Sequence, residues 1–287
     1  MQQRNDFLQN TLLGKHIRYY FYLATMAKRA VKICVISDVH LGFVGCRAKE
    51  LLRYLKSIDP EILILNGDFI DIWQFRTYYF PTSHSRVLQR IFKYVSSGKQ
   101  VYYLTGNHDE LLRKYSGLQL GNFVLDDKLV LELDGKKHWF FHGDIFDISI
   151  HGAKWLAKLG SLGYELMILL NKLVNFVLEL MGREKSSFSQ NMKKATKRGV
   201  KKLNNYEVTA AEVAVENGYD FVINGHSHQP GIKAIRTDKG SVTYVNSGDW
   251  VENMTALEYN NGAWKVIYYK DLKFDDDWLK IDYSDLP

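Results

Sequence analysis

The chain has 287 residues, of which 46% are hydrophobic, and a formal net charge of +6 at pH 7. This length and hydrophobic content suffice for one large domain, and 21 glycines with only 4 prolines exclude a chain dominated by disordered linkers. Two isolated cysteines, Cys34 and Cys46, exclude a disulfide framework or a zinc finger and favour a reducing compartment.

No segment has the ~20 uninterrupted apolar residues of a membrane-spanning helix, so we do not expect an integral membrane protein. Residues 1–30 are interpreted as an N-terminal extension, with an ordinary surface helix as one alternative for residues 6–25. The extension lacks the long apolar core and cleavage site of a secretory signal, so we do not expect export. Either Met1 or Met26 could be the natural start.

Strands and helices alternate in the first part of the chain. The pattern predicts consecutive β-α-β units with strands at 32–37, 61–66 and 100–105 and helices at 46–57 and 83–97. Between 123 and 142, short strands around Asp134-Gly135 predict a hairpin. Residues 232–269 are again β-like, with turns at 238–240 and 260–262.

Five short clusters of metal-ligand residue types follow apolar, strand-like runs. They are Asp38-Val39-His40, Gly67-Asp68, Gly106-Asn107-His108-Asp109, His142-Gly143-Asp144 and Gly225-His226-Ser227-His228. One such motif alone would more often be a turn or the start of a helix, but five in order leave little room for chance. Because each lies at a strand end, a rigid sheet would present all of them to loops.

The residue types fit a site for two divalent metal ions that hydrolyses phosphate esters. Asp68 is predicted to bridge the ions, because an aspartate has two oxygens. We place Asp38, His40 and His228 with Asp68 on one metal, and Asn107, His142 and His226 with Asp68 on the other. The centre would stay cationic, attract an anionic substrate and acidify a shared water that attacks phosphorus.

His108 is predicted to be catalytic and not a ligand, because its side chain diverges from that of its neighbour Asn107. It would protonate the leaving oxygen while Asp109 orients its ring and holds it cationic. Asp71, Asp144 and Asp147 are candidates to accept a hydrogen bond from the second ring nitrogen of ligand histidines. An ordinary structural role is an equal alternative for these three.

A long segment, residues 151–218, separates the cluster at His142 from the cluster at Gly225. Residues 155–181 carry leucines and valines near helical spacing, which predicts one or two amphipathic helices, and packing on the core is the alternative. Residues 183–202 hold eight basic residues and one acid, a net charge of +7. We interpret the segment as a helical cap that suits an anionic membrane surface or an acyl-chain substrate.

Four residues are predicted to bind substrate. Lys193 and Lys197 of the cap would reach phosphate, although a solvated charged face is an alternative for each lysine. In the aromatic loop after Asp68, Trp73 would stack on a base and Arg76 would contact phosphate, with loop packing as the alternative. Nucleic acid fits less well as a partner, because aromatic residues do not interleave with the basic stretch.

Taken together, the five clusters resemble those of the calcineurin-like metallophosphoesterases over residues 31–270. The resemblance implies an α/β (α+β) sandwich of two mixed β-sheets flanked by helices, with a helical cap insertion at about 151–218 and an acidic tail at 271–287. It implies manganese as the metal, with iron, zinc or cobalt as alternatives.

A closer resemblance is to the UDP-2,3-diacylglucosamine pyrophosphatases of lipid A synthesis. It involves the opening motif 36–42, the cluster at His142, the insertion, and the stretches 153–157 and 248–252. The resemblance implies hydrolysis to UMP and 2,3-diacylglucosamine 1-phosphate by a cytoplasmic protein peripheral to the inner membrane. His108 departs from the best-studied branch, which has arginine there. The alternatives are a phosphodiesterase or phosphatase for a soluble nucleotide and, from another class, a metal-free scaffold.

Overall fold

Parallel strands form the centre of the first of two β-sheets. The computed structural model describes residues 28–73, 79–146 and 206–274. In the seven-stranded sheet, β1, β2, β3 and β5 are parallel neighbours, and the strand order is β12-β11-β1-β2-β3-β5-β4. The strands are β1 (Arg29–Ile36), β2 (Ile58–Asn66), β3 (Gln100–Leu104), β4 (Leu118–Leu120), β5 (Phe123–Asp126), β11 (Thr255–Asn260) and β12 (Ala263–Tyr268).

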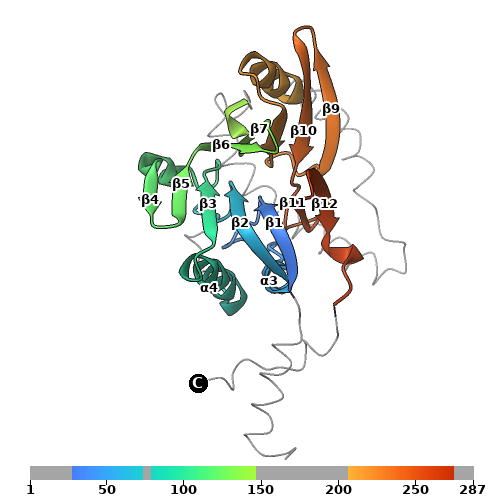
Figure 1. Cartoon of the computed structure of the whole chain (residues 1–287). Helices are drawn as coiled ribbons and strands as arrows, with labels where there is room; N and C mark the ends of the chain where they lie inside the picture. The colour runs from blue at the N-terminus through green and yellow to red at the C-terminus, as the bar shows by residue number, and fades with distance from the viewer. Residues whose placement is uncertain (1–27, 74–78, 147–205, 275–287) are drawn as a thin grey trace, which may run out of the picture.

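The second sheet has five strands in the order β6-β7-β8-β10-β9, with β7, β8 and β10 parallel. Its strands are β6 (Lys128–Leu133), β7 (Lys136–Phe141), β8 (Phe221–Asn224), β9 (Gly231–Thr237) and β10 (Gly240–Asn246). Both sheets are therefore mixed, with parallel strands in the middle and antiparallel strands at the edges (Figure 1).

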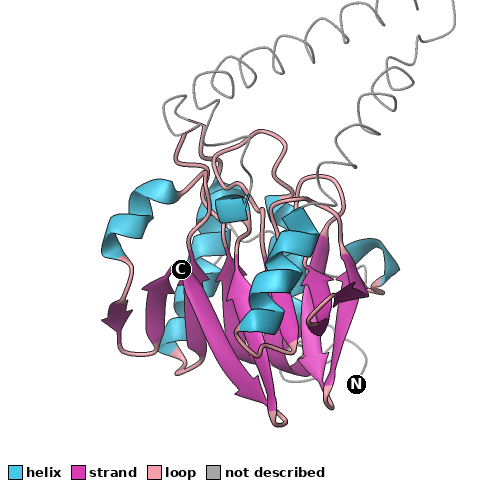
Figure 2. Ribbon diagram, turned by 90° about the horizontal axis from the view of Figure 1, so that it is seen from above, coloured by secondary structure: helices cyan, strands magenta, loops and turns pink. Residues whose placement is uncertain are grey.

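Helices cover the outer faces of the two sheets (Figure 2). The helices α3 (Ala48–Ser57) and α4 (Thr82–Ser96) pack on the seven-stranded sheet, and residues 206–216 are helical and pack on the other sheet. Short 3-10 turns are η2 (Glu110–Tyr115), η3 (Asp144–Phe146) and η4 (Tyr269–Asp271). The layers thus follow the order helix, sheet, sheet, helix.

The alternation of side chains along β1 shows why this strand is apolar throughout. Cys34 and Ile36 belong to the core beneath α3 and α4, whereas Ile33 and Val35 belong to the core between the sheets. Successive side chains of a strand point to opposite faces, so a strand covered on both faces must be apolar at every position.

The structure confirms the predicted sandwich of two mixed sheets flanked by helices. It also confirms the three strands and two helices of the β-α-β units, whose ends differ from the predicted ones by up to three residues. The hairpin is confirmed as well: β6 and β7 meet at Leu133 and Lys136, and Asp134 and Gly135 of the turn have φ of 52° and 74°. The edge strand β4 was not predicted. Most of the predicted cap falls outside the described residues, and among those described no helix combines the length and apolar character needed to cross a membrane.

Candidate metal centre

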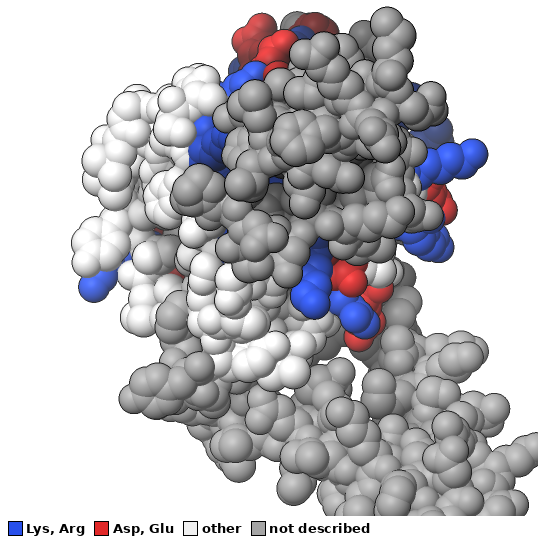
Figure 3. Space-filling model, turned by 90° about the horizontal axis from the view of Figure 1, so that it is seen from below, with Lys and Arg blue, Asp and Glu red and all other residues white. Residues whose placement is uncertain are grey.

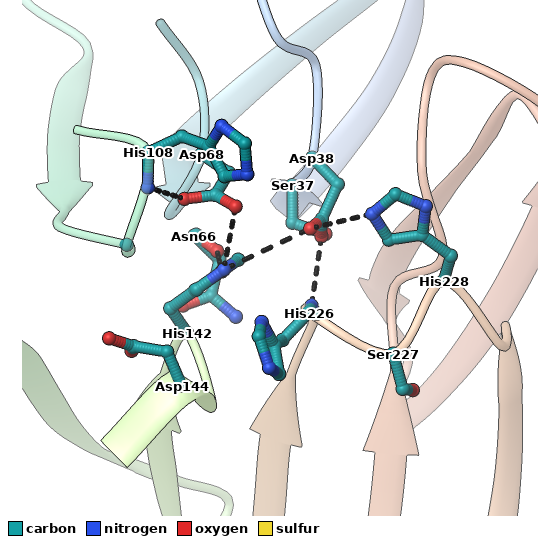
Figure 4. Close-up of polar contacts among 12 residues, drawn as sticks. Ser37, Asp38, Asn66, Asp68, His108, His142, Asp144, His226, Ser227 and His228 are labelled. Atoms are coloured by element: carbon teal, nitrogen blue, oxygen red, sulfur yellow. Dashed lines mark hydrogen bonds and ion pairs between the residues drawn. The ribbon is translucent and has the colours of Figure 1, made fainter. Parts of the chain in front are cut away.

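All five predicted clusters lie at the carboxyl ends of parallel strands. Asp38, Asp68 and Asn107 follow β1, β2 and β3 of one sheet, and His142 and His226 follow β7 and β8 of the other. The loops from both sheets therefore converge on one end of the sandwich, where their side chains point toward one another (Figure 4). Ligand sites in α/β folds form at this edge, because the strands end there together.

The backbone is strained at five of the seven predicted ligands. Asp38, His40, Asp68, His226 and His228 all have φ between 51° and 61°. Left-handed backbone is uncommon for residues other than glycine and costs free energy, so it survives only where the surrounding structure enforces it. The strain turns each side chain out of its strand direction and into the shared centre.

The glycines of the motifs are required by close approach. A Cβ atom on Gly106 would lie 2.2 Å from Asp68 Oδ1, and one on Gly225 would lie 2.3 Å from Asp38 Oδ2. These distances are far below van der Waals contact, so any larger residue would displace the carboxylates. The sequence pattern of glycine beside a ligand residue thus reflects the tight packing of loops around the centre.

Each of the two carboxylates uses one oxygen for the backbone and leaves one for the centre. Asp68 Oδ1 accepts a hydrogen bond from His108 N at 2.8 Å, and Asp38 Oδ2 accepts one from His226 N at 3.0 Å. The remaining Asp68 Oδ2 lies 3.2 Å from His142 Nε2 and 4.0 Å from His40 Nε2, between the two predicted half-sites. A single oxygen of Asp68 therefore faces both half-sites, while the other is used by the backbone.

The described residues form three overlapping groups with ligand atoms within 4.8 Å of one another. The groups are Asp38-His40-His228, His40-Asp68-His108 and Asp68-His142-His226. The first and third correspond to the two half-sites expected from the sequence, and the second joins them through Asp68 and His40. The His and Asp clusters are consistent with a binuclear metal site.

Several buried polar atoms at this point fit metal ions better than any protein partner. Within the described residues, Asn107 Oδ1 is buried and has no hydrogen-bonding partner. Asp38 Oδ1 and His142 Nε2 are buried too, and their near neighbours are other predicted ligands, His228 Nε2 at 3.1 Å and Asp68 Oδ2 at 3.2 Å. Buried polar atoms are almost always hydrogen-bonded, so such a group calls for an explanation. Carboxylate oxygen, amide oxygen and imidazole nitrogen are ligands for divalent transition metals, which would satisfy all three atoms.

The environment of His108 corrects the predicted role of Asp109. His108 Nδ1 lies 3.2 Å from the Asp71 carboxylate, which is also 3.5 Å from His40 Nδ1. The buried Asp109 instead accepts hydrogen bonds from Phe69 N, Tyr103 Oη and Gly106 N. Asp109 thus ties the loops after β2 and β3 together, and Asp71 orients His108. The adjacency of Asp109 in sequence was misleading, because neighbouring side chains diverge.

The charges of the centre shift several pKa values. Burial alone would lower the pKa of His142, but the carboxylates of Asp68 and Asp38 raise this pKa well above its usual value. Burial would also lower the pKa of His108, but Asp71 and Asp68 raise it. Burial and the charge of Asp68 raise the pKa of Asp109 to about 6. The carboxylates therefore create a strongly negative site that favours cations, whether protons or metal ions.

Other predicted contacts of the ligand histidines turn out differently. His142 Nδ1 bonds to the backbone carbonyl of Asn66 at 2.9 Å, not to Asp144. Asp144 accepts a hydrogen bond from Arg113 Nη2 at 2.6 Å and so fastens η3 to η2. A backbone carbonyl leaves no sequence signal, which is why the partner of His142 could not be predicted. Asp147 lies outside the described residues.

Of the four predicted substrate-binding residues, the structure describes only Trp73. Its ring centroid lies 4.9 Å from that of His108, and the side chain is 42% exposed, so it flanks the centre at the surface. Arg76, Lys193 and Lys197 lie outside the described residues.

Comparison with curated proteins finds relatives over most of the chain. UDP-2,3-diacylglucosamine hydrolases from Stenotrophomonas maltophilia and Aliivibrio fischeri are 28% and 27% identical to this chain, covering 80% and 82% of it and 96% and 97% of their own lengths. A protein of that name from Vibrio cholerae is 28% identical over 78% of this chain and 93% of its own length.

Solved structures of similar chains include a novel archaeal phosphodiesterase, with a TM-score of 0.40, 16% identity and coverage of 82% of this chain and 98% of that one. Vps29 from Entamoeba histolytica complexed with zinc has a TM-score of 0.35 and 11% identity, covering 83% of this chain and 98% of that one.

A sequence profile of one family covers both the strand ends and the ligand clusters. The profile described as calcineurin-like phosphoesterase matches residues 31–230, which contain all seven predicted ligands. Together with the buried His and Asp clusters, this match makes the protein a metallophosphoesterase, a hydrolase that depends on metal ions. The chain belongs to the calcineurin-like phosphoesterase family.

Proposed function

We propose that this metal-dependent phosphoesterase hydrolyses the pyrophosphate bond of a lipid-linked nucleotide, UDP-2,3-diacylglucosamine, to UMP and 2,3-diacylglucosamine 1-phosphate. The observation that carries the chemistry is the convergence of three overlapping groups of His and Asp side chains on one end of the sandwich. The substrate is supported by relatives that bear the name of this hydrolase and match about four fifths of the chain.

In this proposal, two divalent ions, with manganese expected, are held by the predicted half-sites. Asp38, His40 and His228 would hold one ion, Asn107, His142 and His226 would hold the other, and Asp68 would contact both. When bound, such ions supply positive charge and lower the pKa of a coordinated water. The left-handed backbone at five of these seven residues fixes their side chains before any ligand arrives, which reduces the cost of binding.

His108 is proposed to act as the general acid. It lies against the group of His40 and Asp68 without being needed to complete either half-site. Asp71 holds the ring through Nδ1, so Nε2 is the atom that would deliver a proton to the leaving oxygen. Trp73 packs beside the ring and would shield it from water or stack on the base of the nucleotide.

We place the protein in the cytoplasm at an anionic membrane surface, where a lipid-linked substrate would be found. The support is the net charge of +7 over residues 183–202 beside an apolar helical pattern. On the described face seen from below, basic side chains stand in separate groups with acidic ones beside several of them (Figure 3). This is not the continuous basic stripe typical of a nucleic-acid interface.

The test is release of UMP from UDP-2,3-diacylglucosamine by purified protein with manganese, with Asp68→Ala as control. We expect hydrolysis by the unaltered protein and none by the variant. A protein that ignores acyl chains and cleaves a soluble nucleotide phosphodiester equally well without lipid or detergent would contradict the lipid substrate. Absence of bound metal would contradict the metal centre itself and favour a scaffold.

A further inference from the structure

One loop contacts the backbone of two predicted ligands of the same half-site. The loop 247–253 follows β10, and within it Trp250 N donates to the carbonyl of Asp38 at 3.0 Å. At the other end of the loop, Asn253 Nδ2 donates to the carbonyl of His228 at 2.9 Å. The chain segments that carry Asp38 and His228 are 190 residues apart, yet both are attached to one short turn.

Asp249 organises this turn. It is fully buried, and its Oδ1 accepts hydrogen bonds from Val251 N at 2.8 Å, Glu252 N and Asn253 N. Its Oδ2 accepts from Asn253 Nδ2, so the amide group of Asn253 lies between Asp249 and His228. The charge of a buried carboxylate is thus used to fix the amide that holds His228, because hydrogen bonds to an ionised acceptor are strong.

The rest of the turn is anchored in the core. Trp250 is fully buried, with its ring 5.4 Å from that of Tyr54, and its carbonyl accepts from Arg47 N at 2.9 Å. Gly248 has φ of 73°, and a Cβ atom there would lie 2.1 Å from Thr255 Oγ1. These contacts leave the turn little freedom, so it can impose a conformation on the ligands it touches.

The second half-site is held by different contacts. His142 is fixed by the carbonyl of Asn66. His226 donates its backbone N–H to Asp38, which the turn contacts through Trp250 and not through Asp249 or Asn253. Among the described residues, the side-chain hydrogen bonds of Asp249 and Asn253 go to their own turn and to His228. His228 also has the left-handed φ of 54°, which must be enforced by its surroundings.

We infer that Asp249 and Asn253 are positioning residues for one metal ion of the pair, the ion of Asp38, His40 and His228. This inference rests on the metal centre proposed above. Groups that orient metal ligands typically affect metal affinity by about 10- to 100-fold when they are removed. Among the described residues, the Asn253 amide bonds to His228 and to no predicted ligand of the other half-site, so we expect its loss to weaken that one ion.

The experiment is a titration of metal-free full-length protein with Mn²⁺, followed by the electron paramagnetic resonance signal of the free ion. For Asn253→Ala we expect the dissociation constant of one of two ions to rise about tenfold or more, with the other unchanged. Activity should return at saturating manganese. Asp249→Asn should also weaken the binding of one ion. If Asp249→Asn does not fold, Asn253→Ala alone still tests the inference.

Asn122→Ala is the matched control. Like Asn253, Asn122 is half-buried and donates from Nδ2 to a backbone carbonyl, that of Val95 at 2.9 Å. Unlike Asn253, it lies in the turn between β4 and β5. Asn122→Ala should leave the affinities of both manganese ions unchanged. Equal weakening of both ions in Asn253→Ala, or no change in either, would overturn the inference while the metal centre stands. If the unaltered protein binds no manganese, both proposals are overturned.

Discussion

Two histidines on strand β7 and just after it, four residues apart, have opposite surroundings. His138 and His142 are both buried, with 1% of each residue exposed. His138 stacks on Phe221 with ring centroids 4.2 Å apart and accepts a hydrogen bond from Trp264 Nε1 at its Nδ1. His142 faces the carboxylates of Asp68 and Asp38. One ring lies among aromatic groups, and the other lies among charges.

The pKa values follow from these surroundings. Burial lowers the pKa of His138 to about 4, whereas the carboxylates overcome burial and raise the pKa of His142 well above its usual value. A buried histidine is therefore not a functional signal by itself. The two pKa values differ because the seven-stranded sheet places carboxylates beside His142 and an aromatic ring, that of Trp264, beside His138.

The largest expected effect comes from replacing His142 by Ala. Loss of a ligand should lower kcat/KM by about a thousandfold or more, equivalent to about 4 kcal/mol in the activation free energy. Metal content measured on the purified variant should fall with it. His138→Phe, which preserves the aromatic stack, is the control and should retain both metal and activity. Equal losses of metal and activity in the two variants would contradict the different roles assigned to His142 and His138.

His108 provides a third case, a histidine at the centre that is not needed as a ligand. His108→Ala should lower kcat by about 10²- to 10⁴-fold, the usual contribution of a general acid, with both metals still bound. Asp71→Asn should have a smaller effect of about 10- to 100-fold, because it acts through the ring. Steady-state kinetics with metal analysis checks both variants. Collapse of metal content in His108→Ala would make His108 a ligand and refute its assigned role.

Acid should destabilise the fold through His138. Its pKa is about 4 in the folded protein, below the usual 6.5, so the unfolded chain binds more protons between these values. The stabilisation is present above pH 6.5 and is lost as the pH falls toward 4. The full shift would correspond to about 3 kcal/mol, and we expect about 1 to 2 kcal/mol after solvent screening.

Denaturant unfolding at several pH values measures this effect against His138→Phe, which cannot be protonated. The free energy of unfolding of the variant should fall less steeply between pH 6.5 and 4. Identical slopes would show that His138 does not contribute to acid sensitivity.

Trp264→Phe should have the smallest effect. It removes the hydrogen bond to His138 Nδ1, 3.1 Å long, and leaves a buried acceptor without its donor. We expect a loss of about 1 kcal/mol in the free energy of unfolding, measured by denaturant titration. Manganese affinity should not change, because the indole bonds to His138, which is not a predicted ligand. A loss of metal binding would indicate coupling between the two ends.

Much of the fold could be predicted from local pattern. Apolar runs such as Ile33–Ile36 predicted strands, and Asp134-Gly135 predicted a hairpin, because its left-handed backbone suits these residues. The edge strand β4 could not be predicted in this way. Its three residues are all exposed, and pairing with β5 alone makes it a strand.

The candidate site shows the same division. The ligand types and their order could be predicted, because glycine beside Asp68 or Asn107 marks a loop in which only glycine fits. The orienting partner of His108 could not, since Asp71 is far from it in sequence and Asp109 is adjacent. Nor could the turn around Asp249, in which Trp250 bonds to the distant Asp38 and Asn253 bonds to His228.

The sequence by itself determined which residues can bind metal and that they follow strands, because residue chemistry and apolar periodicity are local properties. Only the tertiary structure decided which oxygen of Asp68 faces both half-sites, which carboxylate serves His108, and why His138 and His142 differ. The physical reason is that charge, burial and hydrogen-bond partners depend on which strands become neighbours, and residues remote along the chain supply them.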